Sequence, residues 1–150
     1  MTTTNTVAIF GSRDITRENA YVLFEQHLSS LLSQGRTWLL GGSRGLDQWA
    51  IEWLMEHGET CWLVIAYTRG QQPQWLQPWF DEVERVVELR LPKRKSASAI
   101  RNRHMVELAG VVFGFWSAKG GITLKTLKHA LTKRREVHAI PVAPKADAEY

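Results

Sequence analysis

Three glycine-bearing stretches hold the residues whose types could do chemistry. They are Gly11-Ser12-Arg13, residues 41–47 (GGSRGLD) and residues 117–124 (SAKGGITL). Glycine lets a backbone approach a ligand closely, serine and threonine offer hydroxyl groups, and arginine is a bidentate donor to phosphate. The chemistry that these residue types favour is the binding of an anion such as a phosphate group.

Each stretch follows an apolar run and precedes a helical pattern. The apolar runs are residues 7–10, 38–40 and 111–116, and such short runs are typical of fully buried strands. A strand, a glycine turn and a helix together present free backbone N–H groups and the positive end of the helix to an anion. In a parallel sheet the three turns emerge at the same edge, so the sequence predicts a nucleotide or phosphate site there.

Two further groups of residues complete the predicted site. Arg101, Asn102 and Arg103 are expected in the first turn of a helix, where basic residues oppose the helix dipole. A bound anion would explain them, and a solvated helix end is the alternative. Asp47, at the start of another helix, is available to a ribose hydroxyl, or else is a first-turn residue that suits the dipole. No catalytic residue is identified, and Asp47 is the only candidate.

The complete set of expected ligand contacts is Gly11, Ser12, Arg13, Gly41, Gly42, Ser43, Gly45, Asp47, Arg101, Asn102, Ser117, Gly120, Gly121 and Thr123. The stretch at Gly11 matches neither the Gly-x-Gly-x-x-Gly dinucleotide fingerprint nor the P-loop. The serines of the three stretches lack a recognisable base, so a hydrolase triad is not supported. No histidine has metal-ligand spacing with another histidine or a cysteine, so no metal site is predicted.

The elements that must position these residues follow from the apolar pattern. Strands are expected at 7–10, 37–40, 60–66, 85–91, 111–116 and 137–142. Helices are expected from the cap Thr16 to the stop Gly35, at 46–58, around 80–84, from 96 or 98 to 109, and at 123–134. This alternation predicts an α/β, Rossmann-like doubly wound and mostly parallel sheet with helices on both faces. Ligands of such sheets bind outside the carboxyl ends of the strands.

No internal repeat or linker divides the chain. We therefore expect a single domain over residues 1–150, with a core at about 7–142 and a polar tail at 143–150. Ile100, His104 and Leu108 are predicted to share the apolar face of their helix. Trp75 and Trp79 stand in a stretch rich in glutamine and proline, and are expected to stack on a base, cover the site or form a subunit contact.

The composition excludes several classes of protein. The 150 residues, 44% hydrophobic and 23% charged, suffice for one globular core. The single cysteine, Cys61, excludes an internal disulfide framework and is expected to be an inert residue of a buried strand. No apolar run approaches the roughly 18 residues of a membrane span, and residues 1–6 do not resemble a signal peptide. We expect a cytoplasmic protein without a membrane partner.

The positive charge of the chain is concentrated in its second half. The net charge is +4, and Glu107 is the only acid between Leu89 and Arg135. A basic half suggests a polyanionic or phosphorylated partner. A solvated surface is the alternative, because Lys125, Lys128 and Lys133 have the spacing of an outer helix face.

Four segments together resemble the SLOG superfamily. They are VAIFGSRD, LLGGSRGLDQWA, RNRHMVELAGVVFGFW and KGGITLKTLKHA, and the likeness extends over about residues 7–142. It is closest to the small YspA/YpsA-related members, and the superfamily also contains the LOG phosphoribohydrolases and the DprA/Smf proteins. The resemblance implies a Rossmann-like domain that binds a nucleotide or a nucleotide-derived ligand, in a homodimer or larger homo-oligomer.

Three functions follow from the resemblance and the residues. The first is binding of a nucleotide or ADP-ribose-like ligand, with Arg13 and Arg101 on phosphate and Asp47 on a sugar hydroxyl. The second is a LOG-type nucleoside 5'-monophosphate phosphoribohydrolase. The LOG motif is Pro-Gly-Gly-x-Gly-Thr-x-x-Glu, and the presence of Thr126 at the position of its glutamate argues against this function. The third is binding of single-stranded DNA through the basic half, as in DprA. No cofactor is predicted beyond such a nucleotide ligand.

Overall fold

The computed structural model describes residues 3–117 and 121–142. Gly120 and the expected tail at 143–150 lie outside the described residues. The strands are β1 (Thr3–Gly11), β2 (Thr37–Leu40), β3 (Thr60–Ile65), β4 (Arg85–Glu88), β5 (Ala109–Trp116) and β6 (Glu136–Pro141). The α-helices are α1 (Arg17–His27), α2 (Leu46–Glu56), α3 (Ala97–Leu108) and α4 (Gly121–Thr132).

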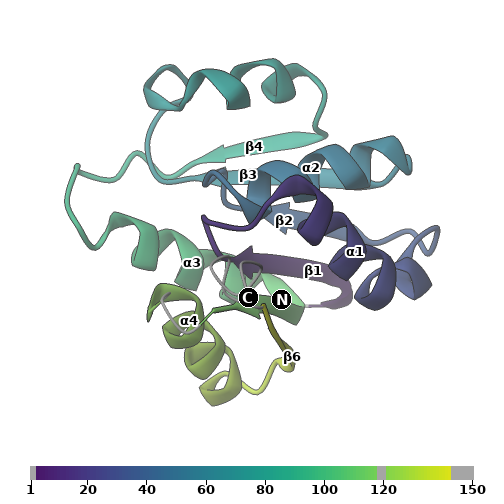
Figure 1. The fold of residues 1–150 in the computed structure, drawn as a ribbon. Coiled ribbons are helices and arrows are strands. Elements are labelled where there is room, and N and C mark those ends of the chain that lie inside the picture. The colour runs from purple at the N-terminus through teal and green to yellow at the C-terminus, as the bar shows by residue number, and fades with distance from the viewer. Residues whose placement is uncertain (1–2, 118–120, 143–150) are drawn as a thin grey trace, which may run out of the picture.

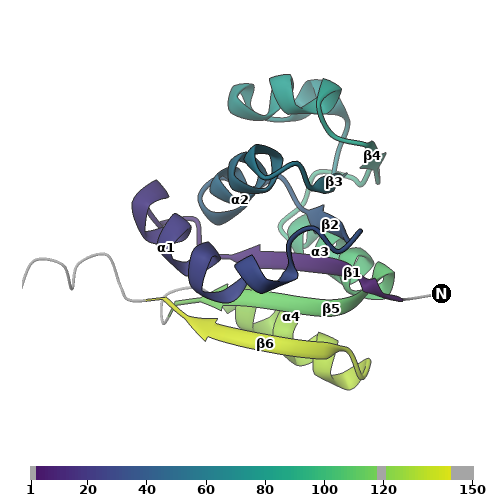
Figure 2. The ribbon, with the colours of Figure 1, turned by 90° about the vertical axis from the view of Figure 1, so that its right-hand side faces the viewer.

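The strands form one six-stranded sheet in the order β4-β3-β2-β1-β5-β6 (Figure 1). Every neighbouring pair is parallel, and Figure 2 shows the arrows of β1, β5 and β6 pointing the same way. The chain fills one side of β1 with β2, β3 and β4 and then crosses to the other side for β5 and β6. The order therefore reverses between β1 and β5, as in a doubly wound fold.

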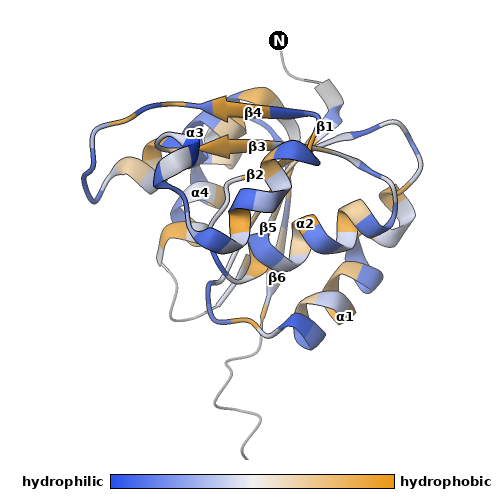
Figure 3. Cartoon of the chain, turned by 90° about the horizontal axis from the view of Figure 1, so that it is seen from above, coloured by the Kyte–Doolittle hydropathy of each residue, from blue (hydrophilic) through white to orange (hydrophobic). Residues whose placement is uncertain are grey.

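Helices cover both faces of the sheet. Phe24 of α1 contacts Trp53 of α2 and Phe115 of β5, with ring centroids 5.5 and 5.7 Å apart. On the opposite face, Met105 of α3 and Leu127 of α4 belong to the second buried cluster. Figure 3 shows hydrophobic and hydrophilic residues alternating along α1 and α2, as expected for helices with one buried side. The predicted Rossmann-like α/β class is confirmed.

The first helix is shorter than its apolar stripe predicts. Thr16 caps it as expected, since its hydroxyl accepts a hydrogen bond from the Asn19 N–H. The α-helix ends at His27, however, and a 3₁₀ turn over Ser29–Leu31 replaces the expected continuation to Gly35. The Ser29 hydroxyl donates to the Glu25 carbonyl, a local bond that competes with helical pairing.

The segment before β4 also differs from the prediction. Instead of a helix around 80–84, 3₁₀ segments occupy Arg69–Gln71 and Gln74–Asp81. Pro78 lies inside the second one and has no N–H for regular helical bonding. Trp75 and Trp79 are half-buried here and pack against the core on the α1 and α2 side.

The buried face of α3 is not the face that its aliphatic residues predict. Its buried side chains are Ala97, Arg101, Asn102, Met105 and Val106, whereas His104 is exposed and Leu108 is 39% exposed. The prediction that Ile100, His104 and Leu108 form the apolar face is therefore wrong. It failed because the buried face includes two polar residues, which an apolar periodicity counts as outward.

Candidate functional site

A cleft of about 220 Å³ opens where β1 and β5 end, at the reversal of strand order. This is the position at which doubly wound sheets bind ligands. Its lining comes from the end of β1, the loops after β1, β2 and β5, the first turns of α2 and α4, and the first two turns of α3. The lining residues are Phe10, Gly11, Ser12, Arg13, Asp14, Ser43, Asp47, Ser98, Arg101, Asn102, Ser117, Ile122 and Thr123.

The structure brings most of the predicted contacts into this cleft. Those that line it are Gly11, Ser12, Arg13, Ser43, Asp47, Arg101, Asn102, Ser117 and Thr123. Gly41, Gly42 and Gly45 belong to the loop between β2 and α2, and Gly121 begins α4. Sequence reasoning missed Phe10, Asp14, Ser98 and Ile122, although all but Ser98 adjoin or lie within the glycine stretches.

Close packing explains the glycines nearest to the cleft. A Cβ at Gly11 would overlap the Leu46 side chain at the start of α2, and one at Gly41 would lie 2.8 Å from Arg101 Nε. Gly45 has a φ of +83°, and a Cβ there would lie 2.5 Å from the Arg13 carbonyl oxygen. The glycines thus let three segments meet closely, whether or not a ligand is bound.

Arg101 joins α3 to the loop after β2. Its Nη1 donates to the Gly41 carbonyl at 3.0 Å, and its Nη2 donates to Ser43 Oγ at 3.3 Å. Nε and Nη2 also donate to Asn102 Oδ1, at 3.2 and 3.0 Å. Arg101 is five residues into α3 rather than in its first turn, so the dipole argument does not apply. Most of its N–H groups bond to protein acceptors, and its effect on a ligand is chiefly that of a buried positive charge.

Asn102 continues this network to α4. Its Nδ2 donates to Thr126 Oγ1 at 3.0 Å, and the Thr126 hydroxyl donates to the Ile122 carbonyl at 2.9 Å. Thr126 is 5% exposed. The position at which the LOG motif has glutamate therefore serves helix packing here and supplies no carboxylate to the cleft.

Asp47 is the buried acid of the site, at 7% exposure. It lies in the first turn of α2, and its Oδ2 accepts a hydrogen bond from the Ser43 N–H at 3.0 Å. Burial raises the pKa of Asp47 to about 6, although Arg101, the Ser43 N–H, Arg13 and the Gly41 N–H all act to lower it. An acid whose pKa is raised by burial in a cleft is typical of a functional position.

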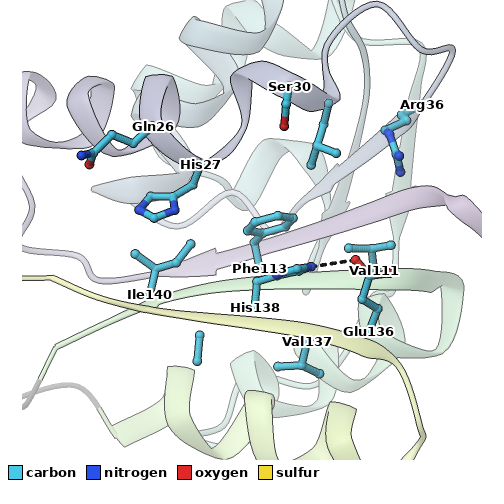
Figure 4. A pocket seen from close by; sticks show the side chains of 12 residues that line it. Gln26, His27, Ser30, Arg36, Val111, Phe113, Glu136, Val137, His138 and Ile140 are labelled. Carbon is cyan, nitrogen blue, oxygen red and sulfur yellow. Dashed lines mark hydrogen bonds and ion pairs between the residues drawn. The ribbon is translucent and has the colours of Figure 1, made fainter.

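A larger groove of about 570 Å³ lies beside β6 and contains none of the predicted contacts (Figure 4). It runs between the end of α1 and the strands β5 and β6. Phe113 and His138 stack there with ring centroids 4.4 Å apart, and His138 Nε2 lies 2.7 Å from Glu136 Oε2. Its residues come from separate elements without a shared motif, which is why the sequence did not indicate it.

The described residues contain neither a metal-binding cluster nor a membrane-spanning helix. Residues 3–117 and 121–142 contain no group of three or more His, Cys, Asp or Glu side chains placed to hold a metal ion. Within the same residues, no helix has the length and apolar character needed to cross a bilayer.

Comparison with solved structures shows the same fold in several proteins. DNA processing protein A from Streptococcus pneumoniae has a TM-score of 0.74 and 20% identity, over 93% of this chain and 51% of that chain. The Helicobacter pylori protein of the same name, described for its single-stranded DNA binding mode, has a TM-score of 0.73 and 18% identity, over 93% and 66%. The chain thus spans about half of the first protein and 66% of the second.

A molybdenum cofactor binding protein from Rippkaea orientalis is also similar, with a TM-score of 0.67 and 19% identity over 96% of this chain and 80% of that one. No curated protein sequence matches the chain significantly. Sheet order, covering helices and cleft together define a Rossmann-like protein of the doubly wound class. The sequence model of DNA recombination-mediator protein A matches residues 1–149, and the chain belongs to that family. The SLOG resemblance is thereby confirmed.

Proposed function

We propose that the protein binds single-stranded DNA along the carboxyl edge of its sheet, with one nucleotide unit in the cleft. Membership of the DNA recombination-mediator protein A family supports this proposal. So does the likeness to the Helicobacter pylori protein, which binds single-stranded DNA. From the sequence, binding of a small nucleotide-derived ligand is the first function and binding of single-stranded DNA is the third. The family match is our reason for proposing single-stranded DNA first.

The observation that carries the proposal is the charge along this edge. Arg13 and Arg44 are exposed on the loops that follow β1 and β2. Lys93–Lys95 are exposed in the loop from β4 to α3, which Figure 3 shows as hydrophilic over much of its length. That loop leads directly to Ser98 and Arg101 in the cleft. The edge therefore offers a row of cations to a phosphate backbone.

The nearby acids leave this charge in excess. Glu88 is the acid at the end of β4, and its carboxylate accepts a bond from the Arg69 N–H and pairs with Arg90 at 3.2 Å. Asp14 and Asp47 are the carboxylates that line the cleft. The cations of the edge thus remain available to a ligand outside the cleft.

The size of the cleft limits what enters it. Its 220 Å³ is below the roughly 300–1,000 Å³ of pockets that enclose a drug-sized ligand. A single sugar and phosphate unit suits this volume better than a dinucleotide does. The remaining nucleotides of a strand would lie outside, along the basic edge.

Fluorescence anisotropy of a labelled oligothymidine tests the proposal. The full chain should bind it, and Arg13→Ala should weaken binding by about tenfold, the effect of losing one charge-assisted hydrogen bond. The far-ultraviolet circular dichroism of the variant should match that of the parent, because Arg13 is exposed. Absence of binding by the folded parent at low salt would contradict the proposal.

A free nucleotide-derived ligand is the second candidate. It is supported by the likeness to the molybdenum cofactor binding protein and by the buried Asp47, which suits a sugar hydroxyl. A thermal-shift panel of nucleotides, NAD and ADP-ribose separates the candidates. A shift with one small ligand and no binding of the oligothymidine would favour this second function.

A further inference from the structure

The carboxylate of Asp47 can accept more hydrogen bonds than the described residues donate to it. A carboxylate has about four acceptor positions. Among the described residues, the Ser43 N–H donates a hydrogen bond to Asp47 Oδ2 at 3.0 Å, and the Gly41 N–H acts on the carboxylate more weakly. Asp47 also lines the cleft while being only 7% exposed. A ligand that enters the cleft therefore meets a buried carboxylate with positions free to accept hydrogen bonds.

The ligand atom that reaches Asp47 must carry a proton. A phosphate oxygen is excluded by like charge, since neither anion has a hydrogen to share. The phosphate has better partners in Arg13 and the Ser12 hydroxyl, which line the same cleft. The Ser12 oxygen already accepts from the Asp14 N–H at 3.2 Å, so its proton remains free to donate. The N–H groups of a base also carry protons, but they lie across the sugar from the phosphate, whereas a sugar hydroxyl lies next to it. Because Asp47 shares this small cleft with Arg13 and Ser12, the arrangement fits a sugar hydroxyl beside a phosphate.

In a DNA strand such a hydroxyl exists only at an end. Internal nucleotides have no 2'-hydroxyl, and their 3' and 5' oxygens are esterified. We infer that the cleft holds the 3'-terminal nucleotide of a single strand, with its free 3'-hydroxyl donating a hydrogen bond to Asp47. The terminal nucleotide keeps its own 5'-phosphate for Arg13 and Ser12. This inference rests on the proposed function and adds to it a preference for 3' ends.

A series of oligothymidines that differ only at the 3' end tests the inference. Competition against a labelled strand should show binding weakened about tenfold when the 3'-hydroxyl is replaced by hydrogen, because a hydrogen bond to a charged acceptor is lost. A 3'-phosphate should weaken binding further, because it brings negative charge to Asp47.

Asp47→Asn is the variant that assigns this effect to the carboxylate. A neutral acceptor makes a bond about half as strong, so the preference for the 3'-hydroxyl should fall from about tenfold to about threefold. Asp81→Asn is the matched control, since Asp81 is an exposed carboxylate in the 3₁₀ segment Gln74–Asp81. It should keep the full preference.

Three results would overturn the inference. The first is equal affinity of the parent protein for all three 3' ends, which would leave strand binding itself intact. The second is an affinity that changes with the chemical group at the 5' end of the strand rather than with the group at the 3' end. The third is equally tight binding of a ribo-oligonucleotide with a blocked 3' end, which would assign the contact to a 2'-hydroxyl. Failure of every strand to bind would instead remove the proposed function.

Discussion

At the scale of single residues, Asp47 is held in a place that disfavours its charge. Arg101 and two backbone N–H groups stabilise the carboxylate, yet burial outweighs them and the pKa rises to about 6 from 3.8. The folded state therefore binds a proton more tightly than the unfolded chain does. The ionised carboxylate reduces the stability of the fold at neutral pH, as is common for residues kept for binding.

Asp47→Asn should accordingly stabilise the protein in a pH-dependent way. At pH 8 the free energy of unfolding should rise by about 3 kcal/mol, the equivalent of a shift of about two pKa units. The gain should shrink as the pH falls through about 6 and vanish below about 3.8, because Asp47 is then neutral in both states. Urea denaturation of both proteins at several pH values measures this. An equal gain at pH 8 and pH 4 would contradict the prediction.

Gly45 is predicted to tolerate no side chain. Gly45→Ala places a methyl group against the Arg13 carbonyl at a φ of +83°, and we expect a loss of more than about 2 kcal/mol from strain and overlap together. Gly58→Ala is the control, since Gly58 has a φ of +72° but nothing within 4 Å of the added atom. It should cost about 1 kcal/mol. Equal losses in thermal denaturation would show that overlap at Gly45 is unimportant.

At the scale of elements, the site depends on how α3 is attached to its neighbours. Arg101 bonds to the loop after β2, and Asn102 bonds to α4 through Thr126. Both side chains are buried polar groups in a helix, and buried polar groups require their partners. The carboxyl edge is thus held together by a polar network rather than by apolar contacts alone.

Arg101→Met should destabilise the protein by about 3 kcal/mol, because it leaves Asp47 buried without its cation. The same substitution in the Asp47→Asn background should cost at least about 1 kcal/mol less, since no buried charge then remains unpaired. A double-mutant cycle by urea denaturation at pH 8 measures this coupling. Additive effects of the two substitutions would show that the two charges do not interact.

The elements also show what the sequence can and cannot predict. The positions of the six strands and of α2 follow from short apolar runs, although β4 ends at Glu88 rather than at the expected Leu91. The three glycine stretches led to most of the cleft. The length of α1 was overestimated because Ser29 bonds locally to the backbone. The buried face of α3 was wrong because Arg101 and Asn102 find partners on elements far away in sequence. Such partners are visible only in the folded chain.

At the scale of the whole molecule, exposed cations lie at both ends of the sheet. Helices that follow parallel strands begin at the carboxyl edge and end at the opposite edge, so Lys93–Lys95 lie beside the cleft while Lys133 and Arg134 lie beyond the end of α4. All of these side chains are exposed. The protein therefore offers two sets of cations that differ chiefly in position.

The salt dependence of single-strand binding tests the central claim most directly. For single strands the slope of log K against log salt is about −0.7 for each phosphate contact. Lys93→Ala/Arg94→Ala/Lys95→Ala should make the slope shallower by about 2 if all three contact phosphates. Lys128→Ala/Lys133→Ala/Arg134→Ala removes the same charge elsewhere and should leave the slope unchanged. Equal slopes for both triple variants, or binding that does not depend on salt, would contradict binding along the carboxyl edge.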